Sequence, residues 1–169
     1  MTKRKAPPGP AAYRSHDHEH CVADALLRAD AVCAARGARL TPLRRRVLEI
    51  VWDSHRPIGA YAILDILAAS SEGRVAPPTI YRALEFLLEH RLVHRVESLN
   101  AYLGCPDPES RHGPQFLICR TCGNTAELHD GAVAQALASD AERLGFAVDR
   151  LTVEASGLCP SCRAGEAPA

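Results

Sequence analysis

The sequence lacks the segments that would place it in or across a membrane. It has no run of about 18 consecutive apolar residues, the length at which a helix becomes a candidate membrane span. Residues 1–20 have no apolar stretch of the kind found in a secretory signal peptide. Both absences indicate a cytoplasmic protein. In that reducing compartment, an odd number of cysteines, seven, argues against a disulfide framework.

Recognisable sets of catalytic residues are also absent. We find no Ser-His-Asp arrangement, no glycine-rich phosphate loop and no paired acids, so we do not expect an enzyme. The formal net charge is zero, which gives no general attraction to nucleic acid. The two halves differ, because residues 1–98 carry 15 Lys and Arg against 11 Asp and Glu, whereas residues 99–169 carry 5 against 9. The basic half is the one able to approach phosphates.

Four of the cysteines form two Cys-x-x-Cys pairs, namely Cys119 with Cys122 and Cys159 with Cys162. Two such pairs can close a tetrahedron of thiolates on Zn2+. A redox protein needs a single pair at the start of a helix, so a structural zinc site is the better interpretation. A thiol oxidoreductase is the alternative from another functional class. A closed four-cysteine site has no open position for chemistry, so it does not by itself supply the function.

Apolar residues at helical spacing predict several short helices in the N-terminal half. Residues 22–36 form one apolar stripe, in which Cys33 is interpreted as a buried small side chain. Thr41 and Pro42 form a typical helix start. A third helix is expected from Gly59, and a fourth begins at Pro77 and Pro78.

The fourth of these helices combines an apolar face with a polar start. Its apolar positions follow the i, i+3, i+4, i+7 spacing and are Ile80, Ala83, Leu84, Leu87 and Leu88. Thr79, Tyr81 and Arg82 fall on the other faces near the first turn, where they could contact bases or phosphates in a major groove. Two strand-like runs around residues 98–100 follow. Helices and then a hairpin favour a winged helix over an ordinary small helical domain.

The remaining C-terminal half predicts a small mixed domain. Residues 115–119 and 125–128 are typical of strands, residues 131–144 of a helix and residues 150–155 of a further strand. The helix carries one apolar stripe, formed by Val133, Leu137, Ala141 and Leu144. An exposed edge strand in so small a sheet is a plausible place for two subunits to join.

Three segments in this order resemble the Fur family of metal-responsive transcriptional regulators, and most closely its zinc uptake regulator (Zur) branch. They are "RLTPLR", "PPTIYRALEFLLEHRLVHRVES" and the two cysteine pairs, and the resemblance runs from about Val22 to Cys162. It implies an α+β protein with an N-terminal winged-helix DNA-binding domain, a hinge and a C-terminal αβ dimerisation domain with a four-cysteine structural zinc. It further implies a homodimer that, when loaded with zinc, binds palindromic operator DNA and represses zinc-uptake genes.

On this basis the chain divides into five parts. Residues 1–20 are expected to be a flexible tail, residues 21–97 the winged helix and residues 98–105 the hinge. Residues 106–163 would form the dimerisation and metal-binding domain, followed by a flexible tail at residues 164–169.

The resemblance also implies two zinc ions per subunit, one structural and one regulatory. The implied regulatory ligands are His94, Cys105, His112 and Glu127. A thiolate in this set favours zinc, whereas iron and manganese sensors prefer imidazole and carboxylate. An iron- or peroxide-responsive relative is the alternative. The implied DNA-contacting residues are Tyr81 and Arg82, with Thr79, Arg44 and Tyr61 as further candidates.

A cluster of histidines precedes the first predicted helix. His16, His18, His20 and Cys21 could together bind zinc weakly, although such a tract is only compositional information. The alternative is a disordered tail in which these residues have no common role.

Overall fold

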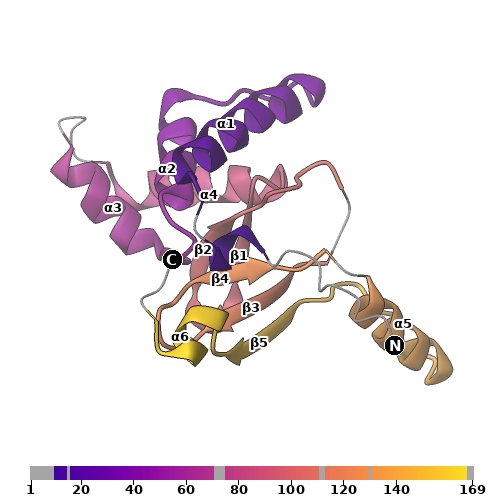
Figure 1. The fold of residues 1–169 in the computed structure, drawn as a ribbon. Coiled ribbons are helices and arrows are strands. Elements are labelled where there is room, and N and C mark those ends of the chain that lie inside the picture. Colours follow the sequence, from indigo (N-terminus) through magenta and orange to yellow (C-terminus); the bar gives the residue numbers. More distant parts are fainter. Residues whose placement is uncertain (1–9, 15, 71–74, 111–112, 130, 167–169) are drawn as a thin grey trace. The chain divides into compact units, whose positions relative to one another are not determined.

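The computed structural model describes residues 10–14, 16–70, 75–110, 113–129 and 131–166 (Figure 1). By its internal contacts the chain forms two units. We call residues 17–112 the helical unit, and residues 1–16 with 113–169 the sheet unit. Across the described ranges, no helix combines the length and the apolar character needed to cross a membrane.

Four helices build the core of the helical unit, and α2 contacts the other three. At the start of α2, the Thr41 side chain accepts a hydrogen bond from the Arg44 amide at 3.5 Å, which is the predicted cap. Leu48, Ile63 and Leu84 bring α2, α3 and α4 together in the buried centre. The helices are α1 (His18–Ala35), α2 (Pro42–Trp52), α3 (Ala60–Ala69) and α4 (Pro77–Glu89).

The first helix begins earlier than its apolar stripe predicts. Asp17 caps α1, because its side chain accepts a hydrogen bond from the Glu19 amide at 3.1 Å. Residues 18–20 are therefore helical, which differs from the flexible tail expected through residue 20. Residues 1–9 and 15 of that expected tail, and residues 167–169 of the other, lie outside the described residues.

A two-stranded antiparallel hairpin follows the helices and completes the predicted winged helix. Asn100 turns the chain between the strands in the left-handed conformation, with φ of 46°. Ahead of α3, Ile58 forms a bridge to Tyr102 and extends the hairpin. The hairpin comprises β1 (Val93–Val96), the 3-10 turn η2 (Glu97–Leu99) and β2 (Ala101–Gly104). β2 pairs along its whole length, so residues 101–104, which fall within the expected hinge at residues 98–105, form an ordered strand.

One close contact fixes the end of the hairpin against the helices. A Cβ atom added at Gly104 would lie 2.1 Å from Cε2 of Trp52. The indole of α2 therefore packs directly against the backbone of β2, and only glycine fits at this position. The next residue in the chain is Cys105.

The sheet unit contains three strands in the order β4-β3-β5. β3 pairs with β4 in the antiparallel direction and with β5 in the parallel direction. A short turn from the N-terminal segment joins this unit, since Ala12 is buried and its carbonyl accepts a hydrogen bond from the Asn124 side chain at 3.1 Å. The elements are η1 (Ala11–Tyr13), β3 (Gln115–Cys119), β4 (Thr125–Glu127), α5 (Ala132–Arg143), β5 (Val153–Gly157) and α6 (Pro160–Ala164).

The predicted helix of the sheet unit is present as α5, but its apolar stripe is not buried. Val133 and Leu137 are about half exposed, and Leu144 is 80% exposed. Phe146, just beyond the helix, is 68% exposed. In Figure 1, α5 extends away from the three-stranded sheet instead of covering it. The chain therefore has an apolar helical face that its own sheet does not use.

Candidate metal centres and DNA-binding face

The four cysteines of the two pairs come together at one end of the sheet. β3 and β5 are parallel neighbours, with Cys119 opposite Gly157, so both strands lead into their cysteine pairs at the same end. The Sγ atoms of Cys119, Cys122, Cys159 and Cys162 all lie within 4.8 Å of one another. The Sγ atoms of Cys122 and Cys159 are 3.8 Å apart. Four thiols gathered in this way fit a structural zinc site.

Backbone amides point at the sulfur atoms and favour negative charge there. Gly123 adopts a φ of 78°, and the amide of Cys159 donates to Sγ of Cys119 at 3.4 Å. Burial by itself raises the pKa of the Cys119 thiol, but hydrogen bonds from the amides of Cys122, Cys159 and Thr121 outweigh it and lower the pKa to about 6. Burial and the neighbouring cysteine sulfurs raise the pKa of Cys162 to about 12. A bound cation would remove this conflict, because it favours the thiolate form at every position.

The wing carries two of the four predicted regulatory ligands. His94 is the second residue of β1, and Cys105 directly follows β2. The ligand atoms of these two side chains lie within 4.8 Å of each other. Cys105 is only 4% exposed, and its amide donates to the Leu92 carbonyl at 3.0 Å. The hairpin register therefore brings a thiol and an imidazole together inside the helical unit.

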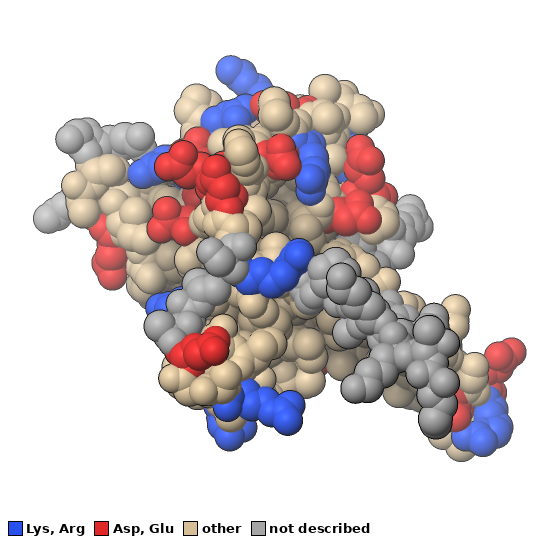
Figure 2. Space-filling view, in the orientation of Figure 1, with Lys and Arg blue, Asp and Glu red and all other residues tan. Residues whose placement is uncertain are grey.

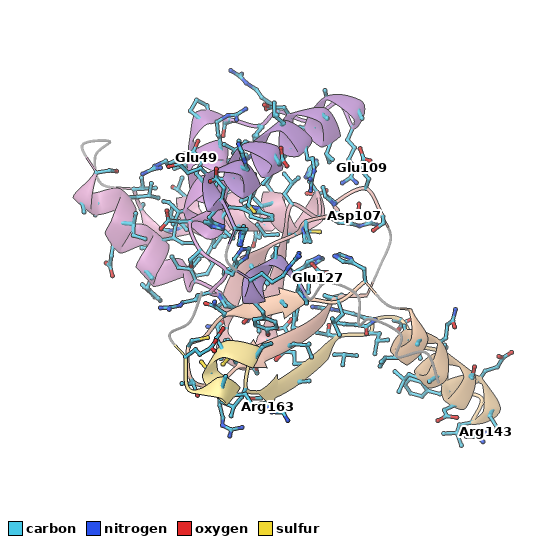
Figure 3. All side chains as sticks on the ribbon, viewed as in Figure 1. Glu49, Asp107, Glu109, Glu127, Arg143 and Arg163 are labelled. Atoms are coloured by element: carbon cyan, nitrogen blue, oxygen red, sulfur yellow. The ribbon has the colours of Figure 1, made fainter. Side chains whose placement is uncertain are left out.

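The other two predicted ligands do not belong to the described part of the helical unit. Glu127 is the last residue of β4 in the sheet unit, and Figure 3 labels it. His112 lies outside the described residues.

The fourth helix presents the predicted polar face. Ile80, Ala83 and Leu84 are buried, whereas Thr79, Tyr81 and Arg82 are exposed. No ion pair or side-chain hydrogen bond joins Arg82 to another residue that the structure describes. Its guanidinium is thus available to an outside partner.

Two further candidate contact residues have different surroundings. Tyr61, at the start of α3, is 70% exposed. The guanidinium of Arg44 lies 3.6 Å from the centre of the Phe86 ring and donates to the Arg39 carbonyl at 2.7 Å. Arg44 is therefore packed within the helical unit. On the face drawn in Figure 2, acidic and basic side chains are interspersed.

The predicted histidine cluster is only partly reproduced. Within the helical unit, His18 and Cys21 lie on the first turn of α1, and the residue that joins them is His55, from the loop after α2. His20 instead lies beside Asp17, with its Nδ1 atom 3.5 Å from the carboxylate, and its side chain is 82% exposed. His16 belongs to the sheet unit. Sequence reasoning missed His55 because nothing in the linear pattern connects it with residues 34 to 37 positions earlier.

The comparisons with known proteins agree with this architecture. The model of the ferric uptake regulator family matches residues 35–156. This range covers well over half of the chain, which therefore belongs to the ferric uptake regulator family.

Within that family, the chain is similar to proteins named zinc uptake regulation protein. The protein of this name from Escherichia coli (strain K12) is 40% identical over 138 residues, which cover 81% of this chain and 80% of the relative. The one from Mycobacterium tuberculosis (strain H37Rv) is 29% identical over 133 residues, covering 77% of this chain and 98% of the relative.

Two solved structures have the same fold. A zinc uptake regulator complexed with zinc and DNA superposes with a TM-score of 0.78 and 36% identity, over 89% of this chain and 98% of that chain. The crystal structure of holo XcZur gives a TM-score of 0.74 and 40% identity, over 82% and 96% of the respective chains.

Proposed function

We propose that this chain is a zinc-responsive transcriptional repressor whose zinc-loaded homodimer binds palindromic operator DNA upstream of zinc-uptake genes. The observation that carries the proposal is the pairing of His94 with Cys105 on the wing of a chain so similar to zinc- and DNA-bound regulators. A thiolate beside an imidazole selects a borderline-soft cation such as zinc.

The proposed DNA contact is the exposed side of α4. Tyr81 and Arg82 lie on the first turns of this helix, which is held from behind by buried leucines. In a winged helix, this is the helix whose N-terminal residues reach base edges in the major groove. Thr79 and Tyr61 are exposed at the starts of α4 and α3 and would contact the backbone nearby. Arg44 retains its role as a candidate only if it leaves Phe86 on binding.

The proposed subunits join through the sheet unit. The exposed stripe of α5 and the edge strand β5 are two surfaces that the sheet unit leaves uncovered. Burial of apolar surface contributes roughly 25 cal/mol per Å², so a second copy covering this stripe would stabilise both partners. A dimer with two-fold symmetry would present two α4 helices to the two halves of a palindromic operator.

The proposed regulatory site uses His94, Cys105, His112 and Glu127, in addition to the structural site of four cysteines. His94 and Cys105 belong to the helical unit and Glu127 to the sheet unit. Zinc supplies a centre that all four side chains can ligate at once. Ligands drawn from both units would then restrict how the two α4 helices of a dimer are presented to DNA. The expected coupling between zinc and DNA binding is about 1–3 kcal/mol, and it is reciprocal.

Zinc-dependent DNA binding of the full chain tests this proposal. The probe is a duplex selected from a random library by the zinc-loaded protein, followed by fluorescence anisotropy at fixed salt and buffered free zinc. We expect affinity to rise with free zinc by about 5- to 150-fold in the native protein. Cys105→Ser should lose this rise, because the wing then lacks its thiolate.

Cys33→Ala is the matched control, because it removes a buried thiol of α1 that lies in none of the candidate sites. It should keep the zinc dependence. If Cys105→Ser responds to zinc as the native protein does, the ligand set is wrong. Cobalt absorption at the regulatory site distinguishes the iron-type alternative, since a six-coordinate spectrum without a sulfur band would exclude the thiolate-containing zinc site.

A further inference from the structure

A further group of side chains that could hold a metal ion lies in the helical unit. Its members in the helical unit are His18 and Cys21, on the first turn of α1, and His55, in the loop between α2 and α3. One ligand atom from each residue lies within 4.8 Å of those of the other two. The His18 and His55 rings meet edge to face, with their centroids 4.6 Å apart. All three side chains are partly buried.

One of the two imidazoles is already oriented as a ligand. Nε2 of His18 lies 2.7 Å from the carbonyl oxygen of Trp52, the last residue of α2. A carbonyl can only accept, so Nε2 carries the proton and Nδ1 presents its lone pair. Histidine ligands in metal sites are typically held by such a bond from the second ring nitrogen. The end of α2 thus fixes the tautomer of His18.

The charges around the thiol also suit a cation. The carboxylates of Asp24, on α1, and Asp17, the cap before it, interact electrostatically with the Cys21 thiol, and Arg28 contributes the opposing charge. The Arg28 guanidinium is itself paired with Asp24 at 3.7 Å. Two imidazoles, one thiol and neighbouring carboxylates together form a donor set of the kind that binds Zn2+.

We propose that His18, Cys21 and His55 form a third, exchangeable Zn2+ site, which links the first turn of α1 to the loop that leads into α3. Three protein ligands leave one coordination position for water or a further donor, so the site binds more weakly than the four-cysteine cluster. It is filled only at higher free zinc. Since α3 begins at Ala60, five residues after His55, the metal would stiffen the segment before the exposed Tyr61.

This site differs from the one that the histidine-rich sequence suggests. That pattern would use His20, whereas the structure places His55, from a distant part of the chain, beside His18 and Cys21. The two possibilities predict opposite effects of two histidine-to-alanine changes, which makes the site testable without a metal-bound structure.

The test is a competitive zinc titration of the full chain against a chromophoric chelator. The native protein should bind three zinc ions per chain, counting the structural and regulatory ones. His55→Ala and the more conservative Cys21→Ser should each weaken the third at least about tenfold, since losing a hydrogen-bond partner of a ligand already costs about 10- to 100-fold. His20→Ala is the matched control and should keep all three. His94→Ala should lose the regulatory ion but keep the third, which separates this inference from the proposed function.

Hydrogen exchange provides a second readout that does not depend on stoichiometry. Raising zinc above the level that fills the first two sites should slow exchange at residues 18–22 and 53–58 in the native protein, but not in His55→Ala. A cooperative unfolding transition of His55→Ala, measured in the presence of chelator, checks that this variant folds. A native protein that binds only two zinc ions overturns the inference. So does a third ion that survives His55→Ala, or one that His20→Ala removes.

Discussion

The two units of this chain differ in the interactions available to stabilise each of them. Of the twelve largest fully buried side chains among the described residues, ten belong to the helical unit and two, Phe116 and Thr125, to the sheet unit. The helical unit therefore has an apolar core of its own. The sheet unit has a cluster of four cysteines and an apolar helix that remains exposed. The comparison teaches that one unit buries an apolar core of its own, whereas the other gathers thiols and leaves apolar surface exposed, which is what the proposed structural zinc and the proposed dimer would use.

The largest expected effect comes from breaking the cysteine cluster. Cys159→Ser should unfold the sheet unit and leave the helical unit folded, because structural zinc contributes about 10–16 kcal/mol in small zinc-dependent domains. Hydrogen exchange followed by mass spectrometry would resolve the two units separately. Cys33→Ala is the control, since it removes a thiol from the helical core instead. Protection retained along β3 and β5 in Cys159→Ser would show that the sheet unit does not need the metal.

A change in the helical core should instead destabilise the helical unit and leave the sheet unit folded. Leu84→Ala removes a fully buried side chain of α4 and should lower the free energy of unfolding of the helical unit by about 2–5 kcal/mol. Trp52 is the single tryptophan and packs in this unit, so its fluorescence in urea reports the helical unit alone. The control is Glu85→Ala, at the adjacent exposed position, which should change the free energy of unfolding little. Loss of the four-cysteine zinc in Leu84→Ala would mean that the units are not independent.

The next largest expected effect concerns the exposed apolar face of α5. Leu137→Glu places a charge in the apolar stripe of α5 and should weaken the proposed dimer by about 2 kcal/mol or more, the effect expected if Leu137 is central to its interface. Sedimentation equilibrium would measure this change. Gln135→Glu adds the same charge on the other side of α5 and should have little effect. Equal dimer dissociation constants for the two variants would show that α5 does not form the dimer interface.

The smallest effect concerns the surface of the helical unit. Arg82→Ala should weaken DNA binding by about 1–3 kcal/mol and leave the unfolding transition unchanged, because this side chain is exposed. Anisotropy titrations over a range of salt would separate a base contact from a phosphate contact. Arg163→Ala, which changes an exposed arginine of α6 in the other unit, is the control (Figure 3). If both variants bind DNA like the native protein, α4 does not carry the recognition face.

Much of the local structure was predictable, because it depends on neighbours in the sequence. Thr41 and Pro42 mark the start of α2, and the apolar spacing of Ile80, Leu84 and Leu87 fixes the buried face of α4. The start of α1 was missed, since Asp17 caps a polar turn that has no apolar periodicity. From the sequence, the residues of β2 were assigned both to a hairpin strand and to the hinge, because their pairing depends on the register with β1.

The sequence by itself determined which side chains could bind metal and which helix faces are apolar, since both follow from residue type and short-range spacing. Only the tertiary structure decided how distant residues meet. Parallel pairing of β3 with β5 gathers the four cysteines at one end of the sheet, and the hairpin register brings His94 to Cys105. The loop after α2 places His55 beside His18 for the same reason: helix packing, not sequence spacing, sets the distance between them.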